Sequence, residues 1–226
     1  MIGGIDISKR ARPAMYRPNN TAIDDPAFLR SAMTELSFGA LVTPHTEGIE
    51  ITHVPWLVRE EAGKTYLESH IARANPHWQL AGRGRSVVIF QGPQAYISPS
   101  HYPSKQVHGK AVPTWAYITV HAHGSLMAID DGNWLHAHLA ALTNRHEAGR
   151  ADPWAVSDAP VAYIAALKRG IVGLRVEVAR MEGKWKVNQD KSEQDRAGTY
   201  HGLMAEGGEQ GIDIAQALAS FPKSEG

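Results

Sequence analysis

Two periodicities of apolar residues alternate along the chain, one typical of helices and one typical of strands. Apolar side chains recur at helical spacing between Phe28 and Leu36, after the capping sequence Asp24-Asp25-Pro26, and the pattern ends at Gly39. The same spacing predicts three further helices, over Trp134–His146, Pro160–Lys168 and Ile212–Phe221. These helices are short and well separated, which is typical of helices at the periphery of a sheet.

Short runs rich in β-branched and aromatic residues predict the strands. Turn residues such as Glu47-Gly48 and Ala62-Gly63-Lys64 divide consecutive runs, which indicates antiparallel pairing. Gly124, inside the longest run, predicts a bend or bulge. The pattern therefore predicts a barrel-type α+β domain with six or seven antiparallel strands and peripheral helices. The expected strands are Gly39–Thr43, Ile49–Val58, Thr65–Ala72, Ser86–Gln91, Val112–Ile129, and Ile171–Ala179 with its continuation Gly183–Val187.

Composition limits the classes of function. With 226 residues, 43% of them hydrophobic, we expect an irregular extension over residues 1–14 and one domain over residues 15–226. The absence of cysteine excludes disulfides, thiolate catalysis and Cys-ligated metal centres. No apolar run approaches the roughly 18 residues that a membrane span needs, and no secretory core is present, so a cytoplasmic location is expected. The 23 basic and 23 acidic residues cancel, which leaves no overall field that attracts nucleic acid.

The segment between Ile89 and Tyr117 combines four prolines with aromatic, hydroxyl and lysine side chains. Prolines and rings lose little conformational freedom on ordering, so such a segment can hold polar groups in fixed positions. Its candidate ligand-binding residues are Ser98, Ser100, Tyr102, Lys105, Lys110, Thr114 and Trp115. The alternative is a stiff connector packed on the sheet.

A second informative segment runs from Glu68 to Trp78, at the end of one strand and the start of a short helix. Arg73 offers a planar fork of donors that suits a phosphate, and Ser69, His70 and Asn75 lie near it in sequence. In the alternative, Arg73 pairs with a surface carboxylate and Asn75 caps the helix.

The third segment, Glu182–Asp190, alternates cationic and apolar side chains. On a strand, Lys184, Lys186 and Asn188 share one face, which either supplies cations and an amide to a ligand or forms a solvated edge.

Twelve histidines raise the question of a metal site, but their spacing favours none. His121 and His123 share one strand face without a 2-His-1-carboxylate pattern, and His136 and His138 point apart on a helix. We therefore expect no metal. No serine-hydrolase elbow, dinucleotide fingerprint or Walker loop is present either.

Taken together, these segments resemble the PaiB-type family of FMN-binding negative transcriptional regulators, whose fold is similar to the FMN-binding split barrel of pyridoxamine-phosphate oxidases. The likeness runs from Met15 to about Leu203. Its shared elements are Met15-Tyr16-Arg17-Pro18, Phe38–Thr43, His53-Val54-Pro55, His70–Pro76, Gly92-Pro93, Tyr96–Lys105, Gly109–Tyr117 and Gly183–Gln189.

The resemblance implies a split β-barrel with FMN as the cofactor. Arg73, with His70 and Asn75, matches the region that grips the flavin phosphate in split barrels. Residues of the proline-containing segment would line the flavin, some of them from a second subunit, and Lys186 and Gln189 would approach the same pocket. A homodimer with flavin at the subunit interface is implied, and nucleic acid is a partner only by family likeness. The expected cofactor-binding residues are His53, Ser69, His70, Arg73, Asn75, Tyr102, Lys105, Lys110, Thr114, Trp115, Lys186 and Gln189.

The sequence leaves more than one function open. A non-catalytic FMN-binding protein of the regulator class is the first interpretation. A flavin-dependent oxidoreductase acting on a small molecule is the second, because a bound flavin brings its own hydride chemistry. A third is a split barrel that binds haem in place of flavin, with a histidine as axial ligand.

Overall fold

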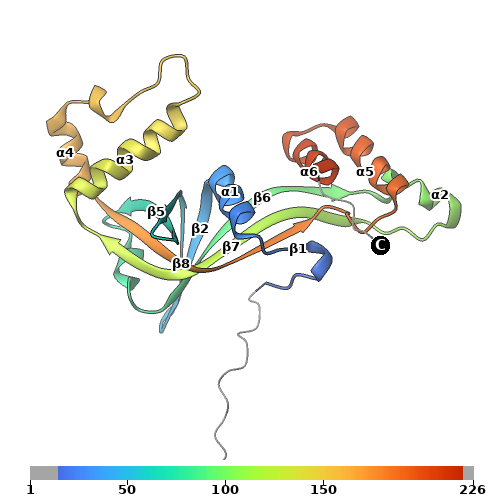
Figure 1. The fold of residues 1–226 in the computed structure, drawn as a ribbon, viewed down its shortest axis with the longest axis horizontal. Coiled ribbons are helices and arrows are strands. Elements are labelled where there is room, and N and C mark those ends of the chain that lie inside the picture. The colour runs from blue at the N-terminus through green and yellow to red at the C-terminus, as the bar shows by residue number, and fades with distance from the viewer. Residues whose placement is uncertain (1–14, 221–226) are drawn as a thin grey trace, which may run out of the picture.

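A curved antiparallel sheet carries the whole fold. A computed structural model of the chain describes residues 15–220, so the irregular extension expected over residues 1–14 lies outside the described residues. The sheet has eight strands in the order β3-β2-β6-β7-β8-β5-β4, and the short β1 (Ala22–Ile23) pairs with β8. It curves like a barrel without closing (Figure 1). The expected antiparallel α+β architecture is confirmed, with eight strands rather than six or seven.

Two hairpins form the edges of the barrel-like half. β2 (Phe38–His45) and β3 (Gly48–Pro55) form one edge, and β4 (Leu57–Glu61) and β5 (Lys64–Ala72) form the other. The single strand predicted over residues 49–58 is therefore wrong, because the chain turns at Trp56 and crosses between the two edges. Trp56 is fully buried and its backbone N–H donates to the Ser37 carbonyl at 2.6 Å, which stabilises this corner.

Three long strands, β6 (Arg85–Ile97), β7 (Thr114–Ile129) and β8 (Ile171–Lys186), run from the barrel-like half into an arm (Figure 1). The bend predicted at Gly124 is confirmed, since the β7–β8 register shifts between residues 123 and 124. A Cβ at Gly124 would lie 2.2 Å from the Glu177 carbonyl oxygen, so only glycine allows this approach. β8 is continuous where the sequence predicted an interruption, and β6 extends six residues beyond its predicted end at residue 91.

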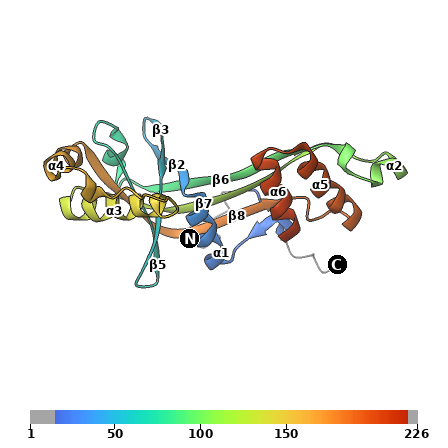
Figure 2. The same ribbon diagram turned by 90° about the horizontal axis from the view of Figure 1, so that it is seen from above.

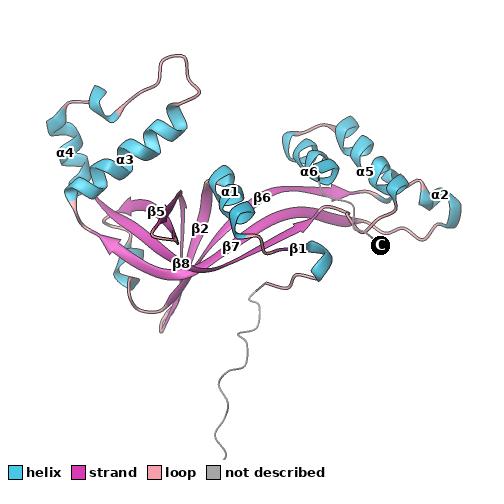
Figure 3. Cartoon of the chain, in the orientation of Figure 1, coloured by secondary structure: helices cyan, strands magenta, loops and turns pink. Residues whose placement is uncertain are grey.

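The helices gather at the two ends of the sheet, with one between them (Figures 2 and 3). The barrel end carries α3 and α4, the arm carries α5 and α6 with α2 at its tip, and α1 lies between. No helix within residues 15–220 is long and apolar enough to cross a membrane. The helices are α1 (Pro26–Leu36), α2 (Ser104–His108), α3 (Gly132–Glu147), α4 (Val161–Arg169), α5 (Glu193–Glu206) and α6 (Glu209–Ser220), with 3-10 turns at Asn19–Thr21, Pro76–Leu80, Pro99–His101 and Val156–Asp158.

The hydrophobic pattern does not predict the short α2 or the longer α5, and the reason is clearest for α5. Its buried positions include Asp195 and Thr199, so it lacks an apolar stripe. It packs instead through Gly202, where a Cβ would lie 2.4 Å from the ring of His101. The small and polar residues of α5 do not predict a helix by themselves, because they fit the surface around His101 that only the folded chain provides.

One hydrophobic core continues from the barrel-like half into the arm. It joins Leu29 and Met33 of α1 to inward residues of the sheet such as Val120 and Leu174, all at most 1% exposed. Side chains alternate across a strand, so the neighbours of these inward residues form an outward face. The described residues cover only part of that outward face.

Candidate functional site

The twelve residues expected to bind the cofactor fall into two groups, one in the barrel-like half and one on the arm. Ala72 pairs with Ile171 at the start of β8, and Tyr117 pairs with Lys186 at its end. Along the curved strand these ends are 15 residues apart, or about 50 Å of chain at about 3.3 Å per residue. The barrel group is His53, Ser69, His70, Arg73 and Asn75, and the arm group is Tyr102, Lys105, Lys110, Thr114, Trp115, Lys186 and Gln189.

Arg73 follows β5 and forms an ion pair with Asp130. Its Nη1 and Nη2 donate to the two carboxylate oxygens at 3.0 and 2.6 Å. Its Nε and Nη2 also donate to the carbonyl oxygens of Arg169 and Ile171, each at 3.0 Å. The alternative considered for Arg73, an ion pair with a surface carboxylate, is thus the one that this structure contains. The side chains of Arg73 and Asp130 remain 38% and 65% exposed, so a ligand can reach both.

A cavity of about 360 Å³ opens beside this ion pair, between α3, α4 and the end of β5. Three cationic side chains, those of Arg73, Lys168 and Arg169, line it together with one carboxylate, that of Asp130. The formal excess of two positive charges matches a phosphate ester, which carries about two negative charges near neutral pH. Lys168 and Arg169 follow the ordinary pattern of a helix C-terminus, so no local signal in the sequence links them to Arg73.

Ser69 and Asn75 do not surround the guanidinium of Arg73 as expected. Ser69 is fully buried on the inward face of β5, and its Oγ has no hydrogen-bond partner among the described residues. Asn75 accepts the His77 N–H at 3.0 Å and donates to Thr52 Oγ1 at 3.1 Å. The helix-capping alternative for Asn75 is therefore the one that this structure contains.

His70 points away from the barrel interior and meets His138 of α3. His70 Nδ1 and His138 Nε2 are 3.1 Å apart, and the His138 ring stacks on Trp134 with the ring centroids 5.1 Å apart. Burial lowers the pKa of His70, and burial followed by the charge of His70 lowers the pKa of His138 to about 4. Both imidazoles are therefore neutral at pH 7.

This buried imidazole makes the stability of the fold depend on pH. The folded state holds His138 neutral down to about pH 4, whereas the unfolded chain takes up that proton below about pH 6.5. Stability is therefore lost as the pH falls through this window, by about 2 kcal/mol between pH 7 and pH 5. Urea unfolding should show His138→Phe losing most of this dependence, while His136→Phe, at an exposed position of the same helix, keeps it. An unchanged dependence in His138→Phe would contradict the assignment.

The arm group includes exposed cations and rings. Trp115 is 55% exposed and packs edge to face on Tyr96, which is 49% exposed. Lys186 Nζ donates to Thr114 Oγ1 at 2.5 Å and to the Trp115 carbonyl at 2.8 Å, so it lies beside both expected neighbours. Lys105 and Lys110 are exposed and take part in no ion pair within residues 15–220. Such a surface is typical of contact with a ligand or a second chain.

Tyr102 and Gln189 are buried in the arm and form hydrogen bonds within it. Tyr102 is 4% exposed and its hydroxyl accepts from Asn188 Nδ2 at 2.9 Å. Gln189 accepts the Val187 N–H and donates to the carbonyls of Asn20 and Trp185. All hydrogen-bonding groups of the Gln189 side chain are thus engaged within the chain.

His53 lies on the outward face of β3, in line with Ile49 and Ile51. The side chains of Ile49 and Ile51 are 65% and 53% exposed, and Phe38 at the start of β2 is 55% exposed. The barrel-like half therefore carries an exposed apolar surface of its own, defined by Phe38, Ile49 and Ile51, far from the rings of the arm.

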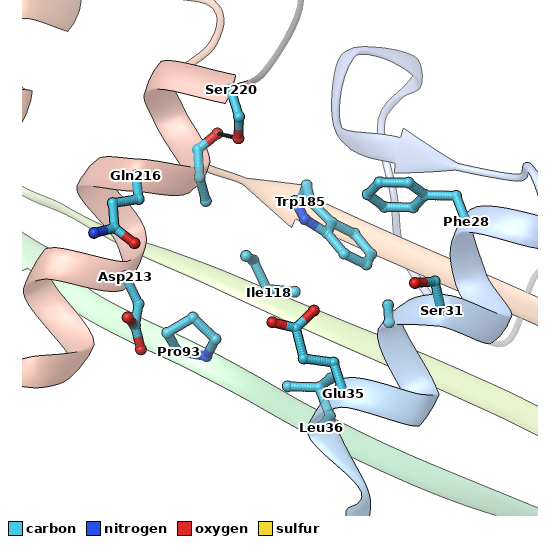
Figure 4. Close-up of a pocket in the computed structure, with 12 residues that line it drawn as sticks. Phe28, Ser31, Glu35, Leu36, Pro93, Ile118, Trp185, Asp213, Gln216 and Ser220 are labelled. Atoms are coloured by element: carbon cyan, nitrogen blue, oxygen red, sulfur yellow. Dashed lines mark hydrogen bonds between the residues drawn. The ribbon is translucent and has the colours of Figure 1, made fainter. Parts of the chain in front are cut away.

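A groove of about 560 Å³ lies between α1, α6 and the arm (Figure 4). Trp185, Ile118 and Pro93 contribute apolar surface, while Glu35 and Asp213 contribute carboxylates. Among residues 15–220 no cationic side chain lines this groove, so these residues repel a phosphate, whereas the cavity at Arg73 attracts one. None of the twelve expected residues lines it.

The histidines hold one arrangement that the sequence analysis missed. No local sequence pattern marks a carboxylate partner for His121 and His123, but Glu182 of β8 pairs directly across from His121. Glu182 lies 59 positions after His123 in the chain, and only the β7–β8 register brings it beside the two histidines.

Known proteins share this sequence pattern and this fold. Residues 15–180 match the sequence family described as "Putative FMN-binding domain". The chain is 27% identical over 212 residues to the protease synthase and sporulation protein PAI 2 of Bacillus subtilis (strain 168), a match that covers 93% of this chain and 100% of that protein.

Two solved structures are similar in fold. The FAD and haem binding protein from Mycobacterium smegmatis superposes with a TM-score of 0.54 at 14% identity, covering 84% of this chain and 81% of that one. The flavocytochrome Anf3 from Azotobacter vinelandii gives a TM-score of 0.52 at 11% identity, covering 78% and 75%. At these identities the likeness establishes the split-barrel fold alone.

Proposed function

Because the chain belongs to the "Putative FMN-binding domain" family, we propose that it is a homodimeric flavoprotein that binds FMN through the cavity at Arg73. The observation that carries this proposal is the formal excess of two positive charges around that cavity. Lys168 and Arg169 add their charges to that of Arg73, and Asp130 is the only carboxylate among the described residues that line the cavity. A phosphate can replace Asp130 as the partner of Arg73 because this ion pair is exposed and weak.

The residues present fit FMN better than a flavin without phosphate. The phosphate meets cations at the barrel end, while the rings of Trp115 and Tyr96 offer flat apolar surface for an isoalloxazine. Lys105 and Lys110 of the same arm are exposed cations without an ion-pair partner within residues 15–220. A bound flavin supplies hydride and electron-transfer chemistry of its own, and the protein holds and orients it.

A second copy of the chain brings the two groups together. The cation cavity and the arm group lie at opposite ends of β8 in one subunit, and no residue of the arm group lines that cavity. In a two-fold dimer, the arm of each subunit reaches the barrel-like half of the other, and the contact is repeated by symmetry. The exposed rings of the arm and the apolar surface of Phe38, Ile49 and Ile51 are the surfaces available for this contact.

PaiB-type proteins are named as transcriptional regulators, and we propose that any such effect of this chain is indirect. A formal net charge of zero provides no overall phosphate-neutralising surface for DNA. We therefore place flavin binding first and any effect on transcription downstream of it, through contacts with other proteins.

Titration with FMN, riboflavin and FAD tests the proposal directly. FMN is expected to bind about 100-fold or more tighter than riboflavin, because riboflavin lacks the phosphate and two charge-assisted hydrogen bonds contribute about 3 kcal/mol. Quenching of flavin fluorescence by the full-length protein measures both affinities. Equal affinities would contradict a phosphate site at Arg73, and tighter FAD binding would reassign the cofactor.

The visible spectrum of the untreated protein separates the remaining alternatives. Flavin bands are expected, and a Soret band in their place would favour the haem-binding alternative. Anaerobic addition of NAD(P)H then distinguishes the two flavin functions. Rapid bleaching favours an oxidoreductase, and a yellow but inert protein favours a binding module.

A further inference from the structure

His121, His123 and Glu182 form a compact cluster on the outward face of the sheet. His121 and His123 are two positions apart on β7, so both imidazoles point to the same side. Glu182 of β8 stands directly across from His121. The nitrogen and oxygen atoms that the three side chains offer all lie within 4.8 Å of one another.

The two oxygens of Glu182 have different surroundings. Oε2 lies 3.0 Å from His123 Nε2, on the side of the imidazoles. Oε1 accepts from Arg180 Nη1 at 2.5 Å and lies 3.8 Å from Arg17 Nε. One oxygen is thus held by arginine while the other faces the histidines, as in metal sites where an outer group orients a carboxylate ligand.

The arginines and carboxylates around the cluster carry equal and opposite formal charges. Arg17 also pairs with Asp24 at 2.6 Å, so two guanidinium groups face two carboxylates. The side chain of Glu182 is only 1% exposed, whereas that of His123 is 18% exposed. The carboxylate is therefore fixed, and the imidazole side is open to solvent.

We propose that His121, His123 and Glu182 bind one divalent first-row transition ion, such as Zn²⁺. Two imidazole nitrogens and one carboxylate oxygen suit such ions and leave a position open for water. Metal–ligand distances of about 2.0 Å place tetrahedral ligand atoms about 3.3 Å apart, close to the existing separation of Glu182 Oε2 and His123 Nε2. Rotation of the partly exposed imidazoles completes the site without moving the strands.

Zn²⁺ titration of the chelator-treated full-length protein tests this proposal, with calorimetry giving affinity and stoichiometry. One ion per chain is expected, and Co²⁺ in its place should give the strong visible bands of a tetrahedral site. His121→Ala and His123→Ala should each weaken Zn²⁺ binding by at least about 100-fold, because loss of even an outer-sphere partner costs 10- to 100-fold. His136→Ala, at an exposed position of α3, is the matched control and should bind as the wild type does.

Two further variants separate a metal site from a structural cluster. Glu182→Gln keeps the shape of the side chain and should weaken Zn²⁺ binding, while Arg73→Ala should leave it unchanged even if flavin binding is lost. Unaltered affinity in the His121→Ala/His123→Ala double variant would overturn the proposal. Absence of Zn²⁺ binding in a wild type whose thermal unfolding is cooperative would overturn it as well.

Discussion

Replacing Arg73 with alanine is expected to weaken FMN binding by about 100-fold or more, since it removes at least two charge-assisted hydrogen bonds worth about 3 kcal/mol together. The remaining cations, Lys168 and Arg169, attract the phosphate without the planar fork that binds two of its oxygens at once. Fluorescence titration of the purified variant with FMN measures the loss. Riboflavin affinity should hardly change, because the variant alters only the phosphate end.

Asp130→Asn is the matched variant with the opposite expected sign. It frees the guanidinium of Arg73 from an exposed ion pair, so FMN should bind more tightly than it does to the wild type. If Arg73→Ala and Asp130→Asn both weaken FMN binding equally, the effect comes from the broken ion pair and not from phosphate recognition. Arg30→Ala, which breaks the Arg30–Glu60 pair on another surface, controls for the loss of a surface charge.

Mixed dimers should recover the flavin site that two defective parents each lack. One parent carries Arg73→Ala, which removes the phosphate fork, and the other carries Lys105→Ala/Trp115→Ala, which removes the charge and ring of the arm. A heterodimer of the two contains one site with both halves intact if, as proposed, each site takes its halves from different subunits. We expect one tightly bound FMN per heterodimer, against two per wild-type dimer and none in either parent.

Differently tagged subunits allow this heterodimer to be purified after co-expression. Its flavin content, measured after two affinity steps, is the result that decides. No recovery of tight binding would mean that all site residues come from one chain. A monomeric wild type in sedimentation would likewise contradict the shared site. The arm residues altered here are exposed, so the parents should remain folded.

The element types followed from local chemistry, and most of them were predictable. Asp25 caps α1 by accepting the Phe28 N–H, and the Glu47-Gly48 and Ala62-Gly63 turns produce the two edge hairpins. Gly124 marked the bulge because its requirement is steric and belongs to one residue. Helix α5 escaped prediction because its fit depends on His101, which lies almost 100 residues earlier.

The sequence alone established that the chain forms an antiparallel α+β fold and carries a fork of donors, lysines and exposed rings in the order of a known family. Local propensities act over a few neighbouring residues, so they decide helices, strands and turns. Distances between segments depend instead on strand register, which is set by packing across the sheet. Only the tertiary structure therefore revealed that Arg73 meets Asp130, that Trp115 lies at the far end of β8, and that Glu182 stands beside His121 and His123.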